Sequence, residues 1–395
     1  MYRDVIIFTK LGVNLMVYLD NGATSWPKPE QVYRAVDECL RSGGNPGRGV
    51  NQSSLEMSRI IFEARYELAN FLNIPNEDRL IFTKNVTEAI NMVLKGILET
   101  GDHVLISPME HNSVVRPLEY LKENRGISYD LIPSDSQGRL NISEIESLIT
   151  ENTKLLVFTH ASNVLGTVLP ARQLVQIAKS HGLYTLIDGA QSAGNMEVDV
   201  KALKADFFAF TGHKGLLGPQ GTGGLFVREG IELEPLIHGG TGSNSRSLKQ
   251  DGMFPDDFES GTVNMPGIAG LKEGVKYSRD NLTDIISSKQ HLMEKLMDYL
   301  LDKSEIDVYG PPSSSISERV GLVTFNLKNI AADKVGQILD SEYEIITRTG
   351  LHCSPLAHRT AGSIDFGGVR VSIGPFTRED EIDQLIQALD QIINQ

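Results

Sequence analysis

The sequence predicts an α/β protein in which helices cover both faces of a mostly parallel sheet, followed by a smaller α/β domain. Apolar runs of strand length alternate with helical patterns between residues 80 and 210. Several of these runs are continuously apolar, as expected for strands buried on both faces. The chain of 395 residues also exceeds one ordinary core, so we expect a large domain at 17–265 and a small domain at 266–395.

The N-terminal part of the chain is expected to contain a short strand and two helices. Residues 1–16 are interpreted as an extension, and residues 17–30 as a segment that packs with the small domain. A first helix is expected from Pro29, because the first position of a helix does not need the N–H that proline lacks. Its apolar stripe places Cys39 in the core. A second helix is expected over about 52–71.

The middle of the chain carries the alternating pattern. Strands are expected at 80–83, 104–107, 127–132, 155–160, 184–188 and 206–210, and helices at 86–98, from about 113, at 143–149 and at 171–179. In open sheets of this kind, ligands bind outside the carboxyl ends of the strands. Polar residues that directly follow a strand are therefore the candidates for chemistry.

The C-terminal part predicts the smaller α/β unit. Helices are expected at 267–277, 285–301, near 333–339 and from 378, and strands at 321–327, 344–347 and 369–373. A glycine-rich and proline-rich turn is expected at 309–312, before the first of these strands.

Composition excludes several classes of protein. A formal net charge of −14 argues against nucleic acid or an anionic membrane surface as the main partner. Two cysteines, Cys39 and Cys353, cannot form the disulfide framework of a small secreted domain, so a cytoplasmic location is expected. No stretch of the sequence is long and apolar enough to span a bilayer.

Lys214 follows the apolar run 206–210 and lies between Gly212 and Gly215. A lysine at this position can be partly desolvated and lose its proton, as a Schiff-base lysine must. A lysine between glycines is more often solvated in a surface turn, so Lys214 alone does not decide between the two interpretations.

Residues after other expected strands support the functional interpretation of Lys214. Asp188 ends an apolar run, where a carboxylate needs a cation such as a protonated ring nitrogen or a lysine. Thr87 and Glu88 open a helix whose free N–H groups favour phosphate, although Thr before Glu is also a common helix cap. His111 is suited to stacking on a planar ring or to proton transfer, although most loop histidines are simply solvated. Together these residues are the parts needed to hold pyridoxal phosphate.

Ordered motifs extend this set along nearly the whole chain. They are LDNGATSWPKP, NPGRG, NVTEAIN, MEHNSVVRP, HASNVLGT, IDGAQS, FTGHKGLLGPQGTGGL, FESGTVNMPGIAGL, RTGLHCSPLAH and GVRVSIGPF. The chain thereby resembles the class V aminotransferase family of fold-type I pyridoxal-phosphate enzymes, and most closely the cysteine desulfurases and selenocysteine lyases.

The resemblance implies a role for each matching residue around the cofactor. Lys214 forms the Schiff base, Asp188 pairs with the pyridinium nitrogen, and His111 stacks on the ring. Gln191 reaches the ring hydroxyl, and Asn163 lies near the same oxygen or the substrate carboxylate. The resemblance also implies phosphate ligands and a homodimer, with one ligand donated by the second subunit: Thr87, Thr211, His213 and, from that subunit, Thr262.

The resemblance implies that Arg370 clamps the substrate carboxylate, with Asn21 and Arg348 nearby. Cys353 follows an expected strand beside basic residues, and neighbouring positive charge favours a nucleophilic thiolate. An inert thiol in a turn is the alternative, and the spacing of His352, Cys353 and His358 matches no zinc site, so no metal is expected.

The resemblance implies conversion of L-cysteine to L-alanine, with the sulfur transferred to Cys353 as a persulfide and then to an acceptor protein. Selenocysteine or cysteine sulfinate as substrate, another class V reaction, and a non-catalytic sulfur-carrier partner remain open alternatives.

Overall fold

The computed structural model describes residues 16–46, 51–241 and 246–394. Its centre is a seven-stranded sheet in the order β2-β8-β7-β6-β5-β3-β4. The strands are β2 (Leu80–Thr83), β3 (His103–Ile106), β4 (Ser128–Leu131), β5 (Thr153–Thr159), β6 (Tyr184–Asp188), β7 (Phe207–Thr211) and β8 (Gly223–Val227). Neighbouring strands from β4 to β7 are parallel, whereas β8 runs antiparallel to both β7 and β2. The expected α/β class with a mostly parallel sheet is confirmed.

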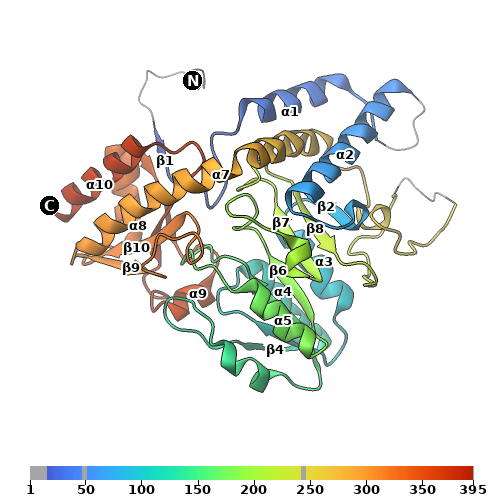
Figure 1. Ribbon diagram of the computed structural model, residues 1–395, viewed down its shortest axis with the longest axis horizontal. Coiled ribbons are helices and arrows are strands. Elements are labelled where there is room, and N and C mark those ends of the chain that lie inside the picture. The colour runs from blue at the N-terminus through green and yellow to red at the C-terminus, as the bar shows by residue number, and fades with distance from the viewer. Residues whose placement is uncertain (1–15, 47–50, 242–245, 395) are drawn as a thin grey trace.

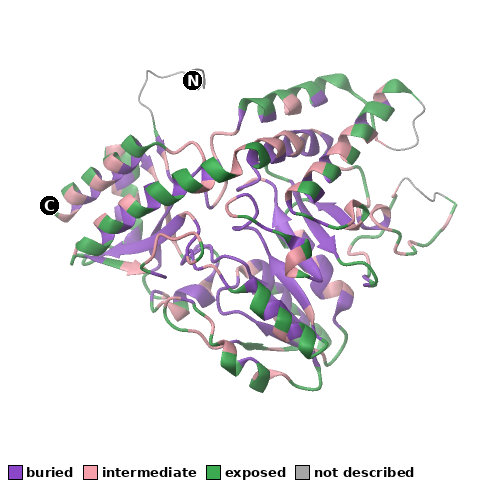
Figure 2. Cartoon of the chain, viewed as in Figure 1, coloured by how far each residue is buried: buried purple, intermediate pink, exposed green. Residues whose placement is uncertain are grey.

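Helices cover both faces of this sheet. They include α2 (Gln52–Phe71), α3 (Val86–Ile97), α4 (Asn112–Arg125), α5 (Ala171–Ser180) and the short α6 (Val200–Leu203). Two separate apolar cores result, one containing Phe158 and Phe208, the other Phe207 and Leu186. Adjacent strand residues thus point into opposite cores, which explains the continuously apolar runs. Figure 2 shows the buried central strands and the exposed outer faces of the helices.

A second, four-stranded antiparallel sheet has the order β12-β13-β10-β9. Its strands are β9 (Ile306–Tyr309), β10 (Leu322–Leu327), β12 (Arg348–Gly350) and β13 (Gly368–Ser372). It packs with α8 (Ala332–Tyr343) and α10 (Glu379–Ile393), while α9 (Pro355–Thr360) follows β12. This is the α/β unit that the C-terminal sequence predicts.

Helix α7 (Met265–Asp302) connects the two parts, as Figure 1 shows. Its first half packs against α2 and α1 (Glu30–Ser42), and its last turns pack in the core of the four-stranded sheet. The prediction of two separate helices at 267–277 and 285–301 is therefore wrong, because one continuous helix spans both ranges. The expected domain boundary at 265/266 falls at the start of this shared helix, and the division into two domains stays a prediction.

The segment before α1 joins the two sheets. Strand β1 (Val17–Tyr18) pairs with β11 (Ile345–Ile346), and Val17 and Leu19 lie in the core beside the four-stranded sheet. Farther along, Ser25 contacts the turn after β7. The extension expected at 1–16 lies outside the described residues except for Met16.

Other differences from the sequence prediction have local causes. The helix expected at 143–149 is two 3₁₀ turns, Ile142–Glu144 and Glu146–Leu148. The glycine-rich stretch after Lys214 contains the strand β8, where a side chain at Gly224 would clash with Phe210. Its glycines allow close strand packing. Because glycine is uncommon inside strands, the sequence did not predict a strand here. Cys39 is buried, as expected.

A buried ion pair ties α2 to the loop that precedes α7. Arg65 binds Glu259 through two hydrogen bonds of 2.8 and 3.0 Å, and both side chains are less than 10% exposed. Glu259 also accepts the backbone N–H of Phe82 in β2. Each charge is buried and depends on the other for compensation.

We expect Glu259→Gln to lower the free energy of unfolding by about 3–5 kcal/mol, because it leaves the Arg65 charge buried without its partner. Glu30→Gln is the control, because it removes an exposed pair between Glu30 and Arg34 and should change stability by less than about 0.5 kcal/mol. Urea denaturation followed by circular dichroism measures both. Equal effects of the two substitutions would contradict the importance of this buried pair.

Candidate active site

The candidate active site lies where the carboxyl ends of β5, β6 and β7 meet the N-terminal segment and β13. Asn163, Asp188 and Lys214 follow or end these three central strands. Arg370 comes from β13 and reaches both Asn163 and the N-terminal segment. Residues from five regions of the sequence therefore share one site.

The backbone around Lys214 is closely packed. A side chain at Gly212 would lie 2.2 Å from the hydroxyl of Thr222, and one at Gly215 would lie 2.4 Å from the carbonyl oxygen of Ala193. The hydroxyl of Ser25 lies 2.9 Å from the carbonyl oxygen of Lys214, to which it donates. The turn is thus held by packing and by the N-terminal segment, unlike a free surface turn.

The amine of Lys214 has a lower pKa than a solvated lysine. Burial lowers the pKa of Lys214 to about 8; Asp188 opposes this shift, and Arg370 and Arg348 add to it. An appreciable fraction of the amine is neutral near physiological pH, which is the form that attacks a carbonyl group. The surface-turn interpretation of Lys214 therefore does not apply.

Asp188 ends β6 and is buried, with Oδ1 accepting a hydrogen bond from the N–H of Ala190 at 2.9 Å. Burial raises the pKa of Asp188, whereas the Ala190 bond and Lys214 act in the opposite direction. A protonated ring nitrogen would compensate this carboxylate. Near it, Gln191 donates its side-chain N–H to the carbonyl oxygen of Gly22 at 2.9 Å.

His111 caps the first turn of α4. Its Nδ1 accepts the backbone N–H of Ser113 at 3.0 Å, so the proton of the neutral ring is on Nε2. Burial, followed by the positive charge of Lys214, lowers the pKa of His111 to about 4. The ring is therefore neutral at physiological pH, as suits stacking on an aromatic cofactor.

The residues expected to hold phosphate surround the ends of β7 and β8. His213 Nδ1 is buried without a hydrogen-bond partner in the described structure, and it can donate to an anion in the tautomer that carries the proton on Nδ1. Thr211 donates to the carbonyl oxygen of Thr222 at 3.4 Å. Thr87 lies in the first turn of α3, whose cap is Asn85, so the alternative of Thr87 as the cap is wrong.

Thr262 is exposed and lines a cavity of about 200 Å³ together with Glu88 and Gly223. A side chain at Gly223 would lie 2.8 Å from Asn85, so this glycine lets β8 approach the start of α3. Together, the buried Asp188, the lysine with a lowered pKa and the unpartnered Nδ1 of His213 fit pyridoxal phosphate.

Arg370 is 2% exposed and binds two segments distant in sequence. It donates to Asp20 Oδ1 at 2.8 Å and to the carbonyl oxygen of Asn163 at 3.0 Å. Its Nε has no partner in the described structure, so one buried donor remains for a substrate carboxylate. The nearest nitrogen of Arg348 lies 3.9 Å from Asp20, which therefore lies beside both guanidinium groups.

Asn21, also expected near the substrate, is engaged with backbone groups. Its amide nitrogen donates to the carbonyl oxygens of Tyr18 and Ser372, and its oxygen accepts the N–H of Trp26. These bonds tie the N-terminal segment to β13. A direct role for Asn21 in substrate binding stays a prediction.

Cys353 is exposed in the loop between β12 and α9. Asn163 holds this loop on both sides of the cysteine: its amide donates to His352 O at 2.7 Å, and its Oδ1 accepts the hydroxyl of Ser354 at 2.7 Å. The carbonyl of Cys353 accepts the N–H of Asn112 at 2.8 Å. His352 and Cys353 have positive φ angles of 50° and 57°, a conformation uncommon outside glycine.

A buried histidine pair supports the same loop. His352 Nε2 donates to Arg348 O at 3.2 Å, so His352 Nδ1 must accept from His358 Nε2 at 3.0 Å. His358 Nδ1 then accepts the hydroxyl of Ser363 at 2.8 Å. Burial lowers the pKa of His352 to about 2 and that of His358 to about 4. Neither ring therefore supplies the positive charge expected beside Cys353.

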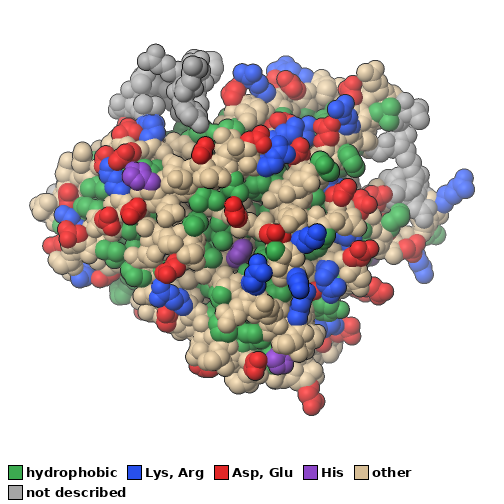
Figure 3. Space-filling model, in the orientation of Figure 1, with side chains coloured by type: hydrophobic (Ala, Val, Ile, Leu, Met, Phe, Trp, Pro, Cys, Tyr) green, Lys and Arg blue, Asp and Glu red, His purple; other side chains and the backbone are tan. Residues whose placement is uncertain are grey.

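Within the described parts of the chain, no three His, Cys, Asp or Glu side chains are placed to hold a metal ion. No helix of the described residues combines the length and apolar character needed to cross a bilayer. Charges of both signs are interspersed on the face shown in Figure 3.

Sequence reasoning assigned no role to Asp20, Ser25, Lys28 or Ser354. Lys28 donates to His213 O at 2.9 Å and to Ser25 at 2.7 Å, and burial lowers the pKa of Lys28 to about 7. Three of the four lie in the motif LDNGATSWPKP, whose polar residues were the available signal.

Comparison with known proteins agrees with this geometry. The family model "Aminotransferase class-V" matches residues 17–385. A probable cysteine desulfurase of Methanothermobacter thermautotrophicus is 37% identical over 386 residues, covering 95% of this chain and 94% of that protein. A cysteine desulfurase of Salmonella agona is 35% identical, covering 95% and 93%.

Solved structures show the same similarity. The apo cysteine desulfurase from Thermococcus onnurineus NA1 has a TM-score of 0.89 and 34% identity, covering 96% of this chain and 95% of that one. A cysteine desulfurase from Escherichia coli, in an S-sulfonic acid form, has a TM-score of 0.85 and 27% identity, with the same coverage. The chain therefore belongs to the class V aminotransferase family, whose pyridoxal-phosphate cofactor is the one expected from the sequence.

Proposed function

We propose that this protein is a cysteine desulfurase, which converts L-cysteine to L-alanine and transfers the sulfur to Cys353 as a persulfide. The observation that carries the proposal is the position of Asn163. Its side chain holds the loop of the exposed Cys353, and its carbonyl oxygen accepts a hydrogen bond from Arg370. The proposed nucleophile and the proposed carboxylate clamp are thereby linked through one residue.

Substrate binding and proton removal involve separate side chains. Arg370 has a free buried Nε donor for the substrate carboxylate. With pyridoxal phosphate bound, Asp188 would hold its ring nitrogen, His111 would stack on the ring, and His213 and Thr211 would bind the phosphate. When bound, pyridoxal phosphate withdraws the electron pair that remains after the α-proton leaves. Lys214 takes that proton at Nζ, for which its pKa of about 8 is suited.

Cys353 carries out the sulfur transfer. Its thiolate attacks the substrate sulfur, a sulfur–sulfur bond forms, and the bond between sulfur and the substrate β-carbon breaks. The electron pair of that bond stays with the β-carbon, which then takes a proton and becomes the methyl group, and Lys214 returns a proton to the α-carbon to complete alanine. Cys353 is oxidised to the persulfide and the β-carbon is reduced, so no external oxidant is needed.

We also propose a homodimer, because several large apolar side chains are exposed on α2 and in the loop before α7. They are Leu55, Phe62, Tyr66, Ile237 and Met253. Burial of such a surface by a second copy would remove it from water. The exposed Thr262 lies near this loop and is the phosphate ligand proposed to act across the dimer.

A cytoplasmic location, a sulfur-acceptor protein and a domain boundary near residue 265 are part of the same proposal. The exposed position of Cys353 supports transfer to an acceptor, because a persulfide there is open to attack by a second thiol.

Lys214 should control attachment of the cofactor. We expect the rate at which cofactor-free protein binds pyridoxal phosphate covalently to rise with pH through a midpoint near 8, because the neutral amine reacts. Asp188→Asn should move the midpoint to lower pH, since Asp188 raises the pKa of Lys214. Absorbance and borohydride trapping on Lys214 measure the rate. A midpoint near the ordinary lysine value would contradict the prediction.

Loss of the thiol should stop sulfur transfer. We expect Cys353→Ser to lower alanine formation from L-cysteine at least about 100-fold, the scale on which loss of a reacting group acts. Cys39→Ser is the matched control, because Cys39 is the other cysteine and lies buried in a separate cluster. Alanine is quantified by chromatography, together with pyruvate and keto acids. Unchanged alanine formation in Cys353→Ser would rule out the persulfide step.

The hydrogen bond between Ser354 and Asn163 should affect kcat more than it affects the KM for L-cysteine. We expect Ser354→Ala to lower kcat about tenfold while KM for L-cysteine stays within about twofold, because one hydrogen bond that positions Cys353 is lost. Ser341→Ala, which removes an exposed hydroxyl bonded within α8, is the control. Steady-state alanine assays give both constants, and an increase in KM alone would contradict the positioning role.

A further inference from the structure

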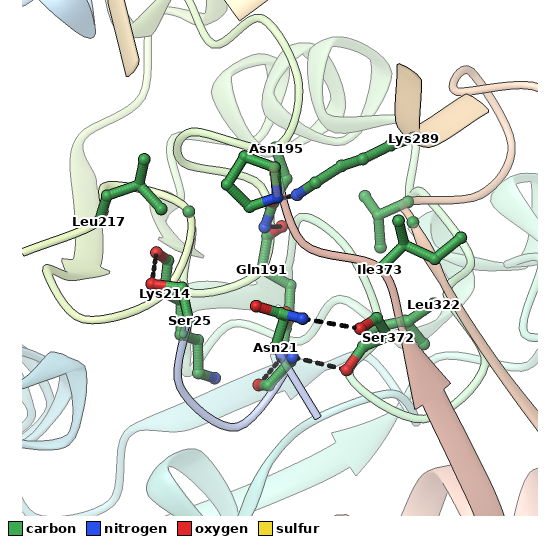
Figure 4. A pocket seen from close by; sticks show the side chains of 15 residues that line it. Asn21, Ser25, Gln191, Asn195, Lys214, Leu217, Lys289, Leu322, Ser372 and Ile373 are labelled. Carbon is green, nitrogen blue, oxygen red and sulfur yellow. Dashed lines mark hydrogen bonds between the residues drawn. The ribbon is translucent and has the colours of Figure 1, made fainter. Parts of the chain in front are cut away.

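A small cavity lies behind the turn of Lys214, where the two sheets meet the N-terminal segment. Its walls include Asn21, Gln191, Asn195, Lys289 of α7 and Ser372 of β13. Figure 4 shows Lys289 extending towards Asn195 across the cavity from Lys214. The volume is about 20 Å³, which holds one water molecule or one monatomic ion.

Lys289 is a buried, charged residue in the lining of this cavity. Its side chain is 5% exposed, and Nζ donates to Asn195 Oδ1 at 2.6 Å. The described residues that line the cavity include no Asp or Glu. By contrast, Lys272 on the same helix is paired with Glu63 at 3.0 Å and Glu273 at 3.5 Å. Lys289 is thus a buried cation whose neighbours provide no negative charge.

The hydrogen bonds of these neighbours leave donors for a ligand. One N–H of Lys289 is used by Asn195, so two remain. Asn195 in turn donates to the carbonyl oxygen of Gln191, and Gln191 donates one of its two amide hydrogens to Gly22. The positive charge of Lys289 disfavours a metal cation in the cavity and favours an anion.

Burial lowers the pKa of Lys289 to about 8, so most of the side chain stays charged at pH 7. A buried ammonium is costly unless a negative charge compensates it. A water molecule in the cavity would satisfy a hydrogen bond but not the charge, whereas an anion satisfies both.

We propose that this cavity binds a monatomic anion, chloride under ordinary conditions, on the ammonium group of Lys289. The ion would lie against α7, the loop after β6, the N-terminal segment and β13. It would therefore stabilise the junction that also positions Gln191, Arg370 and the turn of Lys214. This inference does not depend on the reaction proposed above.

Chloride titration of the holoenzyme tests the proposal. The protein has a single tryptophan, Trp26, whose backbone N–H donates to the cavity residue Asn21 at 3.2 Å, so its fluorescence is used to follow the segment beside the site. Chloride replaces gluconate at constant ionic strength while fluorescence and Tm are recorded. We expect a saturable fluorescence change and a rise in Tm for the wild type, and no response to sulfate beyond that to gluconate.

Lys289→Met should lose the saturable chloride response, whereas the ion-paired control Lys272→Met should retain it. A bromide soak of wild-type crystals should give an anomalous peak within hydrogen-bonding distance of Lys289 Nζ, a measurement that does not rely on the variant folding. The proposal is overturned if wild-type protein shows neither response nor peak, or if Lys289→Met responds as the wild type does.

Discussion

The buried guanidinium of Arg370 is the group on which the assembly of the site depends. It joins β13 to Asp20 in the N-terminal segment and to Asn163 after β5. A buried arginine needs charge compensation and satisfied hydrogen bonds, and Asp20 supplies the charge. Because its partners come from two segments distant from β13, the site forms only when both sheets and the N-terminal segment are in place. We propose that the remaining Nε donor is the one that binds substrate.

Burial also determines which side chains are charged. It lowers the pKa of Lys214 and His111, so that a reactive amine lies beside a neutral ring. The histidines next to Cys353 are likewise neutral, and their hydrogen bonds form a chain of fixed direction from Ser363 to Arg348. They act on the cysteine through the position of its loop. Lys289 differs from Lys272 of the same helix in that it is buried beside an amide and not beside a carboxylate.

The fold class and the cofactor could be predicted from the sequence. Asp188 and Lys214 lie at the ends of apolar runs, and such runs can be recognised within a short stretch of sequence. The bridge made by Asn163 could not, because its partners lie about 190 residues away and depend on tertiary packing. Asp20 was missed for the same reason, since Arg370 is 350 residues distant. Helix α7 was divided in two because the sequence does not reveal that its halves pack on different cores.

The central claim is that Cys353 receives the substrate sulfur. The most direct measurement is mass spectrometry of the holoenzyme after a single turnover with L-cysteine in the absence of reductant. The account predicts that the peptide containing Cys353 gains the mass of one sulfur atom, in amounts equal to the alanine released. Alanine formed while that peptide stays unmodified, or sulfur found only on Cys39, would contradict it.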